Sequence, residues 1–404
     1  MVVGAILIQL ALGAIYAWSV FTPSLVAEGW SKENTQWVFA IGLASFALFM
    51  VFAGKKLTSW GPQKLSWIGG IVLGLGYLLA GLVGGTSFWL LLILIGLVGG
   101  AGIGFAYVVP IAVGMRWFPD KKGMITGLAV AGFGFGAMLW VKLAGEWGNF
   151  LANMGLSSTF IVYGIAFAAM VVIGGLWMKF PPADWKPEGF EASQTASAKT
   201  TSTQEFNSSE MLNKVQFYLI FLTFVFSAGA GLMSIGLMKL YPMEALQNAG
   251  MSSVEASAVA GTAMAVFFSL ANGLGRIIWG LISDKLGRKR SILIMTATQG
   301  IIVLLFTYMA GTEILLYLGA TLIGFNFGGN FALFPTITAD TFGAKNVGQN
   351  YPFIFLAYGV GGILGPILGG KMGDLGNFPL AFTISGIAVL LGTVLIFFVR
   401  PANK

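Results

Sequence analysis

The sequence predicts an all-α integral membrane protein with twelve transmembrane helices, and three observations support this fold class. Hydrophobic residues make up 57% of the chain and charged residues only 9%, and the mean hydropathy is +0.85. A soluble domain carries about 25% charged residues, so this chain has too few to cover a surface that faces water. Twelve long apolar runs follow one another along its 404 residues. The 58 glycines are typical of helices that pack closely within lipid.

Each predicted span is an apolar run of about 20 residues, the length that crosses the hydrocarbon core of a bilayer. The first run, MVVGAILIQLALGAIYAWSVF, lacks the basic region and small-residue cleavage site of a signal peptide, so we expect a spanning helix there. The predicted spans are 2–26, 35–54, 65–86, 88–115, 124–146, 158–180, 215–241, 255–282, 291–311, 313–338, 351–372 and 378–399.

A polar segment divides the spans into six and six. Residues 186–210 read KPEGFEASQTASAKTTSTQEFNSSE, which is rich in Ser and Thr and shows no hydrophobic periodicity. Such a composition favours a flexible linker. We therefore expect one six-helix bundle at 1–180, a linker at 181–214 and a second six-helix bundle at 215–404.

The two halves also repeat each other. GKKLTSWGPQK (54–64) aligns with GLISDKLGRKR (280–290), which matches Gly61 with Gly287, and Pro110 matches Pro335 at an offset one residue shorter. Two parallel six-helix repeats predict pseudo-symmetric bundles and a transporter whose site lies between them.

The basic residues predict the orientation and account for the net charge of +7. If both termini are cytoplasmic, every Lys and Arg falls on the cytoplasmic side except Lys32, Lys142, Lys239, Lys371 and Arg276. This bias follows the positive-inside rule, so we expect cytoplasmic termini and a lipid bilayer, with no nucleic acid as partner.

The chain contains no Cys and no His. Disulfides, Cys or His ligands for zinc or haem, cysteine nucleophiles and imidazole bases are therefore excluded. Nucleophile–base pairs and metal-ligand clusters are missing as well. We expect neither an enzyme nor a catalytic, metal or cofactor site.

Two motifs carry a resemblance to a known family. GLISDKLGRKR resembles the loop signature of the major facilitator superfamily, although the first copy has Thr58 where the family usually has Asp. WFPDKKGMITGLAVAG (117–132) is similar to the helix-5 signature of the monocarboxylate transporters, and it matches at Phe118, Lys121, Lys122, Gly127, Ala129, Ala131 and Gly132. The oxalate–formate exchanger branch is about as similar. The acidic, Gly-rich signature that opens the first helix of the animal monocarboxylate transporters is absent, so the relationship to them is distant.

The resemblance implies the major facilitator fold over the whole chain, transport by alternating access, a functional monomer and the cytoplasmic (inner) membrane of a bacterium. It also implies roles for the cytoplasmic charges Asp284, Arg288 and Arg290, which would pair with neighbouring helix ends and favour the outward-facing state. Charge that merely sets the topology is the alternative for these three residues.

Arg276 lies in ANGLGRIIWG (271–280), inside an otherwise apolar span. A charge at the centre of a spanning helix costs at least about 2.5–3.5 kcal/mol on insertion scales, so it needs a partner, a wet cavity or a function. All fifteen Asp and Glu fall in loops, in the linker or near helix ends. We predict that Arg276 binds an anion, because its planar fork matches a carboxylate. Snorkelling toward the cytoplasm is the alternative.

The resemblance implies the same role, since monocarboxylate transporters and oxalate–formate exchangers place a substrate-binding Arg in the eighth helix. Asn272 lies one turn earlier, where animal monocarboxylate transporters have an Asp taken to carry the proton. Asn cannot titrate, so it is expected to bind a carboxylate or 2-hydroxyl, or else to form an interhelical hydrogen bond. Tyr358 stands where oxalate–formate exchangers have a second cation, a Lys, which favours a monocarboxylate.

Polar and aromatic residues of other spans are expected to face the same space. Asn326, Asn330 and Phe334 recur at i, i+4 and i+8, a stripe that should face the protein interior or a cavity. Ordinary packing is the alternative for every member of this group. The further candidates for substrate binding are Tyr16, Tyr107, Asn330, Phe331 and Phe355, and Gln9 is a possible neighbour.

One phosphate-loop match is rejected. GPILGGKM (365–372) has Met372 where a Ser or Thr would hold magnesium, and no strand precedes it. Gly361, Gly365 and Gly369 instead form a small-residue face for helix packing.

These observations predict a secondary transporter of a small monocarboxylate anion, such as lactate or pyruvate, coupled to a proton. A carboxylate exchanger of the oxalate–formate type is the alternative. The proton-binding group is not identified, because the sequence offers neither a His nor a core acid.

Overall fold

The computed structural model describes residues 1–118, 122–145, 147–182, 185, 205–343, 346–400 and 402. All regular secondary structure in these ranges is helical, and twelve helical segments are long and apolar enough to span a membrane. The prediction of an all-α protein with twelve spanning helices is therefore confirmed. Lys121, Lys345 and most of the predicted linker lie outside the described residues.

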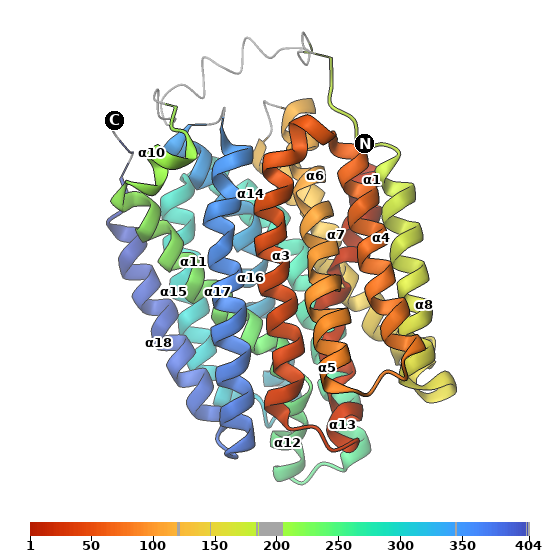
Figure 1. Ribbon diagram of the computed structural model, residues 1–404. Coiled ribbons are helices and arrows are strands. Elements are labelled where there is room, and N and C mark those ends of the chain that lie inside the picture. Colours follow the sequence, from red (N-terminus) through yellow and green to blue (C-terminus); the bar gives the residue numbers. More distant parts are fainter. Residues whose placement is uncertain are drawn as a thin grey trace.

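The first six spans form the half of the molecule drawn in red to yellow-green (Figure 1). The first span is α1 continued by a 3₁₀ turn and a short helix, and the fourth contains a π-helical stretch. Their helices are α1 (Val2–Leu12), η1 (Gly13–Val20), α2 (Thr22–Ala27), α3 (Lys32–Trp60), α4 (Pro62–Leu82), α5 (Phe88–Leu91), η2 (Leu92–Gly99), α6 (Gly100–Trp117), α7 (Lys122–Ala144) and α8 (Phe150–Gly175).

The other six spans form the half drawn in green to blue (Figure 1). The eighth span again contains a π-helical stretch, directly before the helix that carries Arg276. Their helices are α11 (Val215–Leu237), α12 (Leu240–Asn248), α13 (Ser253–Thr262), η3 (Ala263–Phe268), α14 (Ser269–Leu286), α15 (Arg288–Met309), α16 (Glu313–Phe342), α17 (Val347–Asp374) and α18 (Phe378–Phe397).

The end of the predicted linker is ordered, which the Ser/Thr-rich composition did not predict. Residues Ser208–Leu212 form the short helix α10. Asn207 and Glu210 close a capping box at its start, in which each side chain accepts the backbone N–H of the other. Such a box satisfies two otherwise unpaired donors, so a polar segment can still begin a helix.

The repeat seen in the sequence corresponds to a repeated backbone conformation. Gly61 joins α3 to α4 with φ 81° and ψ 153°, and Gly287 joins α14 to α15 with φ 85° and ψ 150°. Only glycine adopts this region without strain, which explains why both copies place Gly there. Pro110 and Pro335 likewise both lie inside helices, α6 and α16.

Glycine also sets how closely the helices pack. A Cβ at Gly365 of α17 would lie 2.1 Å from the carbonyl oxygen of Gly229 on α11, so no larger residue fits there. A Cβ at Gly369 would lie 2.6 Å from Leu237. The glycines of the rejected phosphate-loop match therefore serve helix packing, as predicted.

The two halves meet along two helix pairs. α3 packs against α17, which lie side by side in Figure 1, and α7 packs against α14. The start of α1 and the end of α18 lie at one end of the molecule, which we call the termini side (Figure 1). Functional side chains on α7 and α14 are thus held against each other across the boundary between the halves.

The end opposite the termini is closed by charges that cross this boundary. Asp374, the last residue of α17, accepts hydrogen bonds from the backbone N–H groups of Lys32 and Glu33, both at 3.0 Å. Lys32 pairs in addition with Glu244 at 3.1 Å, and Lys371 with Glu33 at 3.8 Å. These contacts tie the first turn of α3 to α12 and α17.

Candidate binding site at Arg276

Arg276 is completely buried in the middle of the molecule. Its Nη1 donates a hydrogen bond to the carbonyl oxygen of Val130 on α7 at 3.0 Å, and its Nε donates to Oδ1 of Asn272 at 3.2 Å. Its Nη2 has no hydrogen-bond partner. The side chain does not snorkel to the membrane surface, and the guanidinium contacts both halves of the protein.

Two glycines of α7 make this contact possible. A Cβ at Gly127 would lie 2.6 Å from the carbonyl oxygen of Arg276, and a Cβ at Gly134 would lie 2.6 Å from the backbone nitrogen of Gly273. Because α7 and α14 approach this closely, the Arg276 side chain reaches the α7 backbone. The Val130 carbonyl can accept this extra hydrogen bond, since a carbonyl oxygen has two lone pairs.

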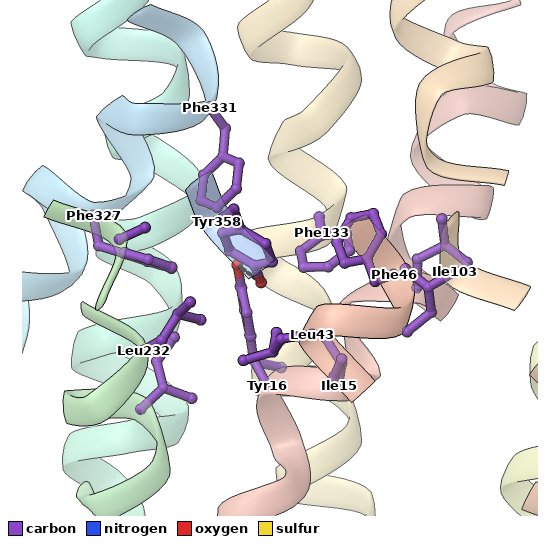
Figure 2. Packing of buried hydrophobic residues seen from close by; sticks show 14 of the residues in the cluster. Ile15, Tyr16, Leu43, Phe46, Ile103, Phe133, Leu232, Phe327, Phe331 and Tyr358 are labelled. Atoms are coloured by element: carbon purple, nitrogen blue, oxygen red, sulfur yellow. Dashed lines mark hydrogen bonds between the residues drawn. The ribbon is translucent and has the colours of Figure 1, made fainter. Parts of the chain in front are cut away.

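Aromatic rings from both halves flank the guanidinium. Its Cζ lies 4.0 Å from the ring centre of Phe331 on α16 and 5.2 Å from that of Phe133 on α7. A desolvated cation–π contact is worth about 2 kcal/mol, which offsets part of the cost of burying the charge. Figure 2 shows that Phe133, Phe331, Tyr16 and Tyr358 converge on one region.

The tyrosines predicted from the sequence belong to this aromatic group. Tyr358 donates a hydrogen bond to the Tyr16 hydroxyl at 3.0 Å, which joins α17 to η1 (Figure 2). The Tyr358 ring lies 4.8 Å from Phe355, and Phe355 lies 5.5 Å from Tyr107. The rings of Tyr16 and Tyr107 lie 4.9 Å and 5.3 Å from that of Phe133, one of the two rings beside the guanidinium.

No Asp or Glu carboxylate in the described ranges pairs with Arg276. Two donors of the site also lack a partner, Asn272 Nδ2 and the Tyr107 hydroxyl, and so does one acceptor, Gln9 Oε1. A buried polar group without a hydrogen bond costs about 1–3 kcal/mol, and a buried charge costs more. The site therefore has one uncompensated positive charge and spare hydrogen-bond donors, which suit an anion.

The polar stripe on α16 faces the protein interior, as predicted, but not all of it faces Arg276. Asn326 donates to Thr298 on α15 at 3.0 Å, and Asn330 accepts a hydrogen bond from Ser227 on α11 at 2.8 Å. Phe334 stacks on Phe224 at 4.2 Å. These contacts hold the second half together, and Asn330 keeps one unpaired donor, its Nδ2.

Sequence reasoning missed two members of the site. Phe133 lies within GFGFG (132–136), where the glycines indicate close helix packing. A phenylalanine in an apolar span is common, so its ring gives no signal of a binding site. Val130 takes part through its backbone carbonyl, which has no signature in a sequence. The Lys121 and Lys122 side chains of the adjacent motif lie outside the described residues.

A cavity of about 470 Å³ opens toward the termini side of the site. It lies between the halves and is lined by residues of α3, α6, α15, α16 and α17, among them Thr58, Arg116, Thr336 and Tyr351. Val108 also lines it and directly follows Tyr107 in α6. The cavity thus lies between the halves, on the termini side of the described structure.

Arg288, one of the three charges implied by the superfamily motif, lines this cavity. Arg288 pairs with Asp284 at 2.6 Å and with Asp340 of α16 at 3.4 Å, and it also donates to Ser283. Asp340 was not predicted, although it is the neighbouring-helix partner that the motif requires. Arg290 is exposed. No cluster of three metal-ligating side chains occurs in the described part of the chain.

Comparison with known proteins identifies the family. The model of the Major Facilitator Superfamily matches residues 3–267 and 231–404. This chain belongs to the major facilitator superfamily. The predicted fold and superfamily are thereby confirmed.

Relatives within the superfamily cover nearly the whole chain. The Uncharacterized MFS-type transporter YhjX of Escherichia coli (strain K12) is 28% identical over 367 residues, which is 89% of this chain and 85% of that protein. The Oxalate:formate antiporter of Oxalobacter formigenes is 26% identical over 404 residues, 99% of this chain and 91% of that protein. Apicoplast pyruvate carrier 1 of Toxoplasma gondii is 24% identical over 379 residues, 82% of this chain and 68% of that protein. The protein is therefore a membrane transporter with relatives of the oxalate–formate and pyruvate type.

Proposed function

We propose that this protein is a secondary transporter of small monocarboxylates, such as lactate or pyruvate, that works by alternating access. The observation that carries the proposal is the buried Nη2 of Arg276, a cationic donor that forms no hydrogen bond with the described residues. A carboxylate supplies both the acceptor and the compensating charge. The names of two relatives, a pyruvate carrier and an oxalate:formate antiporter, agree with a carboxylate substrate.

In this proposal one carboxylate oxygen accepts a hydrogen bond from Arg276 Nη2. The unpaired Asn272 Nδ2 and Tyr107 hydroxyl are the donors available to the second oxygen. Phe331, Phe355 and the Tyr16–Tyr358 pair enclose the short carbon chain. The loaded site carries no net charge, which lowers the cost of moving it through a conformation that is sealed from water.

A single cation favours a monocarboxylate over a dicarboxylate. Tyr358 occupies the place of the second cation of oxalate–formate exchangers, and its hydroxyl is engaged with Tyr16. A second carboxylate would therefore be buried without a counter-charge, at a cost of several kcal/mol.

Two coupling modes are compatible with this site. Proton-coupled symport is the mode that the resemblance to monocarboxylate transporters implies. Exchange is favoured by a specific observation, namely that Arg276 contacts Asn272 and no titratable acid in the described ranges. Without an acid to neutralise Arg276, the empty site carries a net positive charge. Moving the empty protein between its two conformations then costs more free energy than moving the carboxylate-loaded protein.

We further propose that the termini side is cytoplasmic, that the protein lies in the inner membrane of a bacterium and that the monomer is the transporting unit. The distribution of basic residues along the sequence supports this orientation, because it follows the positive-inside rule. The cavity then faces the cytoplasm. Arg288 pairs here with Asp284 and Asp340 of its own half. The role in closing this side that the resemblance implies for Asp284, Arg288 and Arg290 would therefore need contacts with the first half beyond these.

Uptake of labelled lactate and pyruvate into proteoliposomes tests the function. Wild-type protein should show saturable counterflow, and Arg276→Ala should abolish it while eluting as a folded monomer in detergent. Lys64→Ala, which removes an exposed cation, is the matched control and should behave as wild type. Unchanged counterflow by Arg276→Ala would contradict the proposal.

The same vesicles separate the two coupling modes. Symport predicts that an imposed inward proton gradient drives uptake into vesicles with no internal carboxylate. Exchange predicts uptake only when the vesicles contain lactate or another carboxylate, whatever the pH gradient.

A further inference from the structure

The first copy of the repeated loop, between α3 and α4, differs from the second copy in its charge. Three apolar residues of the second copy are replaced and its acid is lost, with Lys55 for Leu281, Lys56 for Ile282, Trp60 for Leu286 and Thr58 for Asp284. In the second copy Asp284 pairs with Arg288 at 2.6 Å. The first copy lacks that acid, so its cations are not neutralised within the loop.

Two of these cations lie beside one exposed ring. The Nζ atoms of Lys56 and Lys64 lie 5.9 Å and 5.5 Å from the ring centre of Trp60, which is 36% exposed. Neither ammonium group forms an ion pair or a hydrogen bond within the described ranges. Two unpaired like charges near one ring create a positive potential that an anion neutralises.

An apolar stripe continues from these lysines along the span. Leu48, Phe52, Lys56 and Trp60 recur every four residues on α3, a spacing that makes each a neighbour of the next on the helix surface. Leu48 is 62% exposed and Phe52 40%, and the Phe52 ring lies 5.7 Å from that of Trp60. The connection from α3 to α4 lies at the termini side (Figure 1). The stripe therefore runs from the end of the span into its apolar part.

The stripe favours a lipid over a soluble anion. A free phosphate would contact the lysines only, whereas a phospholipid also covers the exposed Leu48 and Phe52 with an acyl chain. Trp is enriched at the depth of the headgroups, and lysines near helix ends extend to that depth. Lys56, Trp60 and Lys64 are not among the residues that line the cavity between the halves. This surface is thus separate from the Arg276 site.

We propose that Lys56, Lys64 and Trp60 form a binding site for the headgroup of an anionic phospholipid, such as phosphatidylglycerol. The two ammonium groups bind the phosphate, and one acyl chain lies along Phe52 and Leu48. A headgroup with a net negative charge is preferred, because a zwitterionic headgroup brings its own cation to the lysines. The inference does not rest on the proposed carboxylate function.

Native mass spectrometry of the full chain in detergent tests this site, because the mass of each complex counts the lipids bound. Wild-type protein should bind phosphatidylglycerol more tightly than phosphatidylcholine. A lysine beside an anionic lipid contributes about fivefold in affinity, so Lys56→Gln combined with Lys64→Gln should weaken phosphatidylglycerol binding about 25-fold. Lys64→Gln alone, at an exposed position, should weaken it about fivefold.

Lys289→Gln is the matched control. Lys289 lies at the same end of the molecule, 5.4 Å from the ring centre of the exposed Phe397, where no second lysine shares the ring. Its loss removes one cation and should leave the affinity for phosphatidylglycerol unchanged.

Two further variants separate the charge from the ring. Lys56→Arg combined with Lys64→Arg keeps both charges and should keep the affinity. Trp60→Leu, the residue type of the second copy, should weaken binding while both lysines remain. All of these variants should elute as folded monomers and transport lactate as wild type does, because the surface is separate from Arg276.

Three results would overturn the assignment. Equal binding of phosphatidylglycerol by wild type and by the double lysine-to-glutamine variant would show that these lysines do not form the site. Equally tight binding of phosphatidylcholine would show that apolar contact and not charge holds the lipid. Displacement of phosphatidylglycerol by an equal concentration of inorganic phosphate would show that the lysines bind a soluble anion.

Discussion

Asp374 closes one end of this protein by capping a helix that belongs to the other half. Its two carboxylate oxygens accept the backbone N–H groups of Lys32 and Glu33 at 3.0 Å each. The first N–H groups of a helix lack intrahelical partners, and a carboxylate there also interacts favourably with the helix dipole. Within α3 itself, Ser31 caps only the N–H of Asn34. Closure of this end therefore satisfies backbone donors that separation of the halves would leave free.

Asp374→Ala should shift the protein toward the conformation that is open at this end. Loss of a helix cap costs about 1 kcal/mol, and here the cost falls on the closed state alone, so the ratio of open to closed should rise about fivefold. Spin labels attached to the cysteines of Glu28→Cys and Leu375→Cys, both at exposed positions, report the distance between the two halves at this end. Double electron–electron resonance measures this distance. Ser31→Ala removes a cap within one half and should lower stability without changing the distance distribution. An unaltered distance distribution in Asp374→Ala would show that the cap which Asp374 places on α3 does not contribute to closure.

Arg276→Lys should impair transport nearly as much as Arg276→Ala. A lysine keeps the charge but cannot bond Val130, Asn272 and a carboxylate in one plane. We expect the lactate affinity to fall at least about 100-fold, as for loss of a hydrogen-bonded buried charge pair. The measurement is the lactate dependence of counterflow and of thermal stability. Wild-type affinity in Arg276→Lys would mean that charge alone, without the fork, holds the ligand.

Asn272→Asp should make lactate binding depend on pH. The new carboxylate lies beside Arg276 Nε, where Asn272 Oδ1 now lies at 3.2 Å, and it competes with the substrate while it is charged. Protonation removes this competing charge, so binding should be weak at neutral pH and recover as the pH falls. Asn272→Leu, similar in size and uncharged, should weaken binding equally at every pH. Thermal stabilisation by lactate across pH checks both variants.

Tyr358→Lys should move the preference from monocarboxylates toward dicarboxylates. The lysine would supply a second cation close to the first and remove the hydroxyl that bonds Tyr16. One extra charge-assisted hydrogen bond is worth about 1.5–3 kcal/mol, so the ratio of oxalate to lactate affinity should rise about tenfold or more. Tyr358→Phe, which removes the hydroxyl without adding charge, is the control. Competition of oxalate against labelled lactate measures the ratio.

Much of the architecture is readable from the sequence because membrane spans impose long apolar runs. All twelve predicted spans correspond to helices, although several helices extend beyond them, as α3 (Lys32–Trp60) does beyond 35–54. The extra turns are polar, so hydropathy does not detect them, although backbone hydrogen bonding continues the helix through them. The capping box of α10 was missed for the same reason.

The sequence by itself determined that Arg276 is a costly charge in an apolar helix and that the chain offers no nearby acid to pair with it. Only the tertiary structure decided which groups surround it. Val130 bonds it through a backbone carbonyl, a group present at every residue, and lies 146 positions away in the chain. The contact of Phe133 with the Arg276 guanidinium and the capping of α3 by Asp374 likewise depend on how helices from different halves pack. The contact with Val130 arises because α7 and α14 approach each other closely at Gly127 and Gly134. No local sequence pattern encodes which carbonyl or ring of one helix then lies within reach of a side chain on the other.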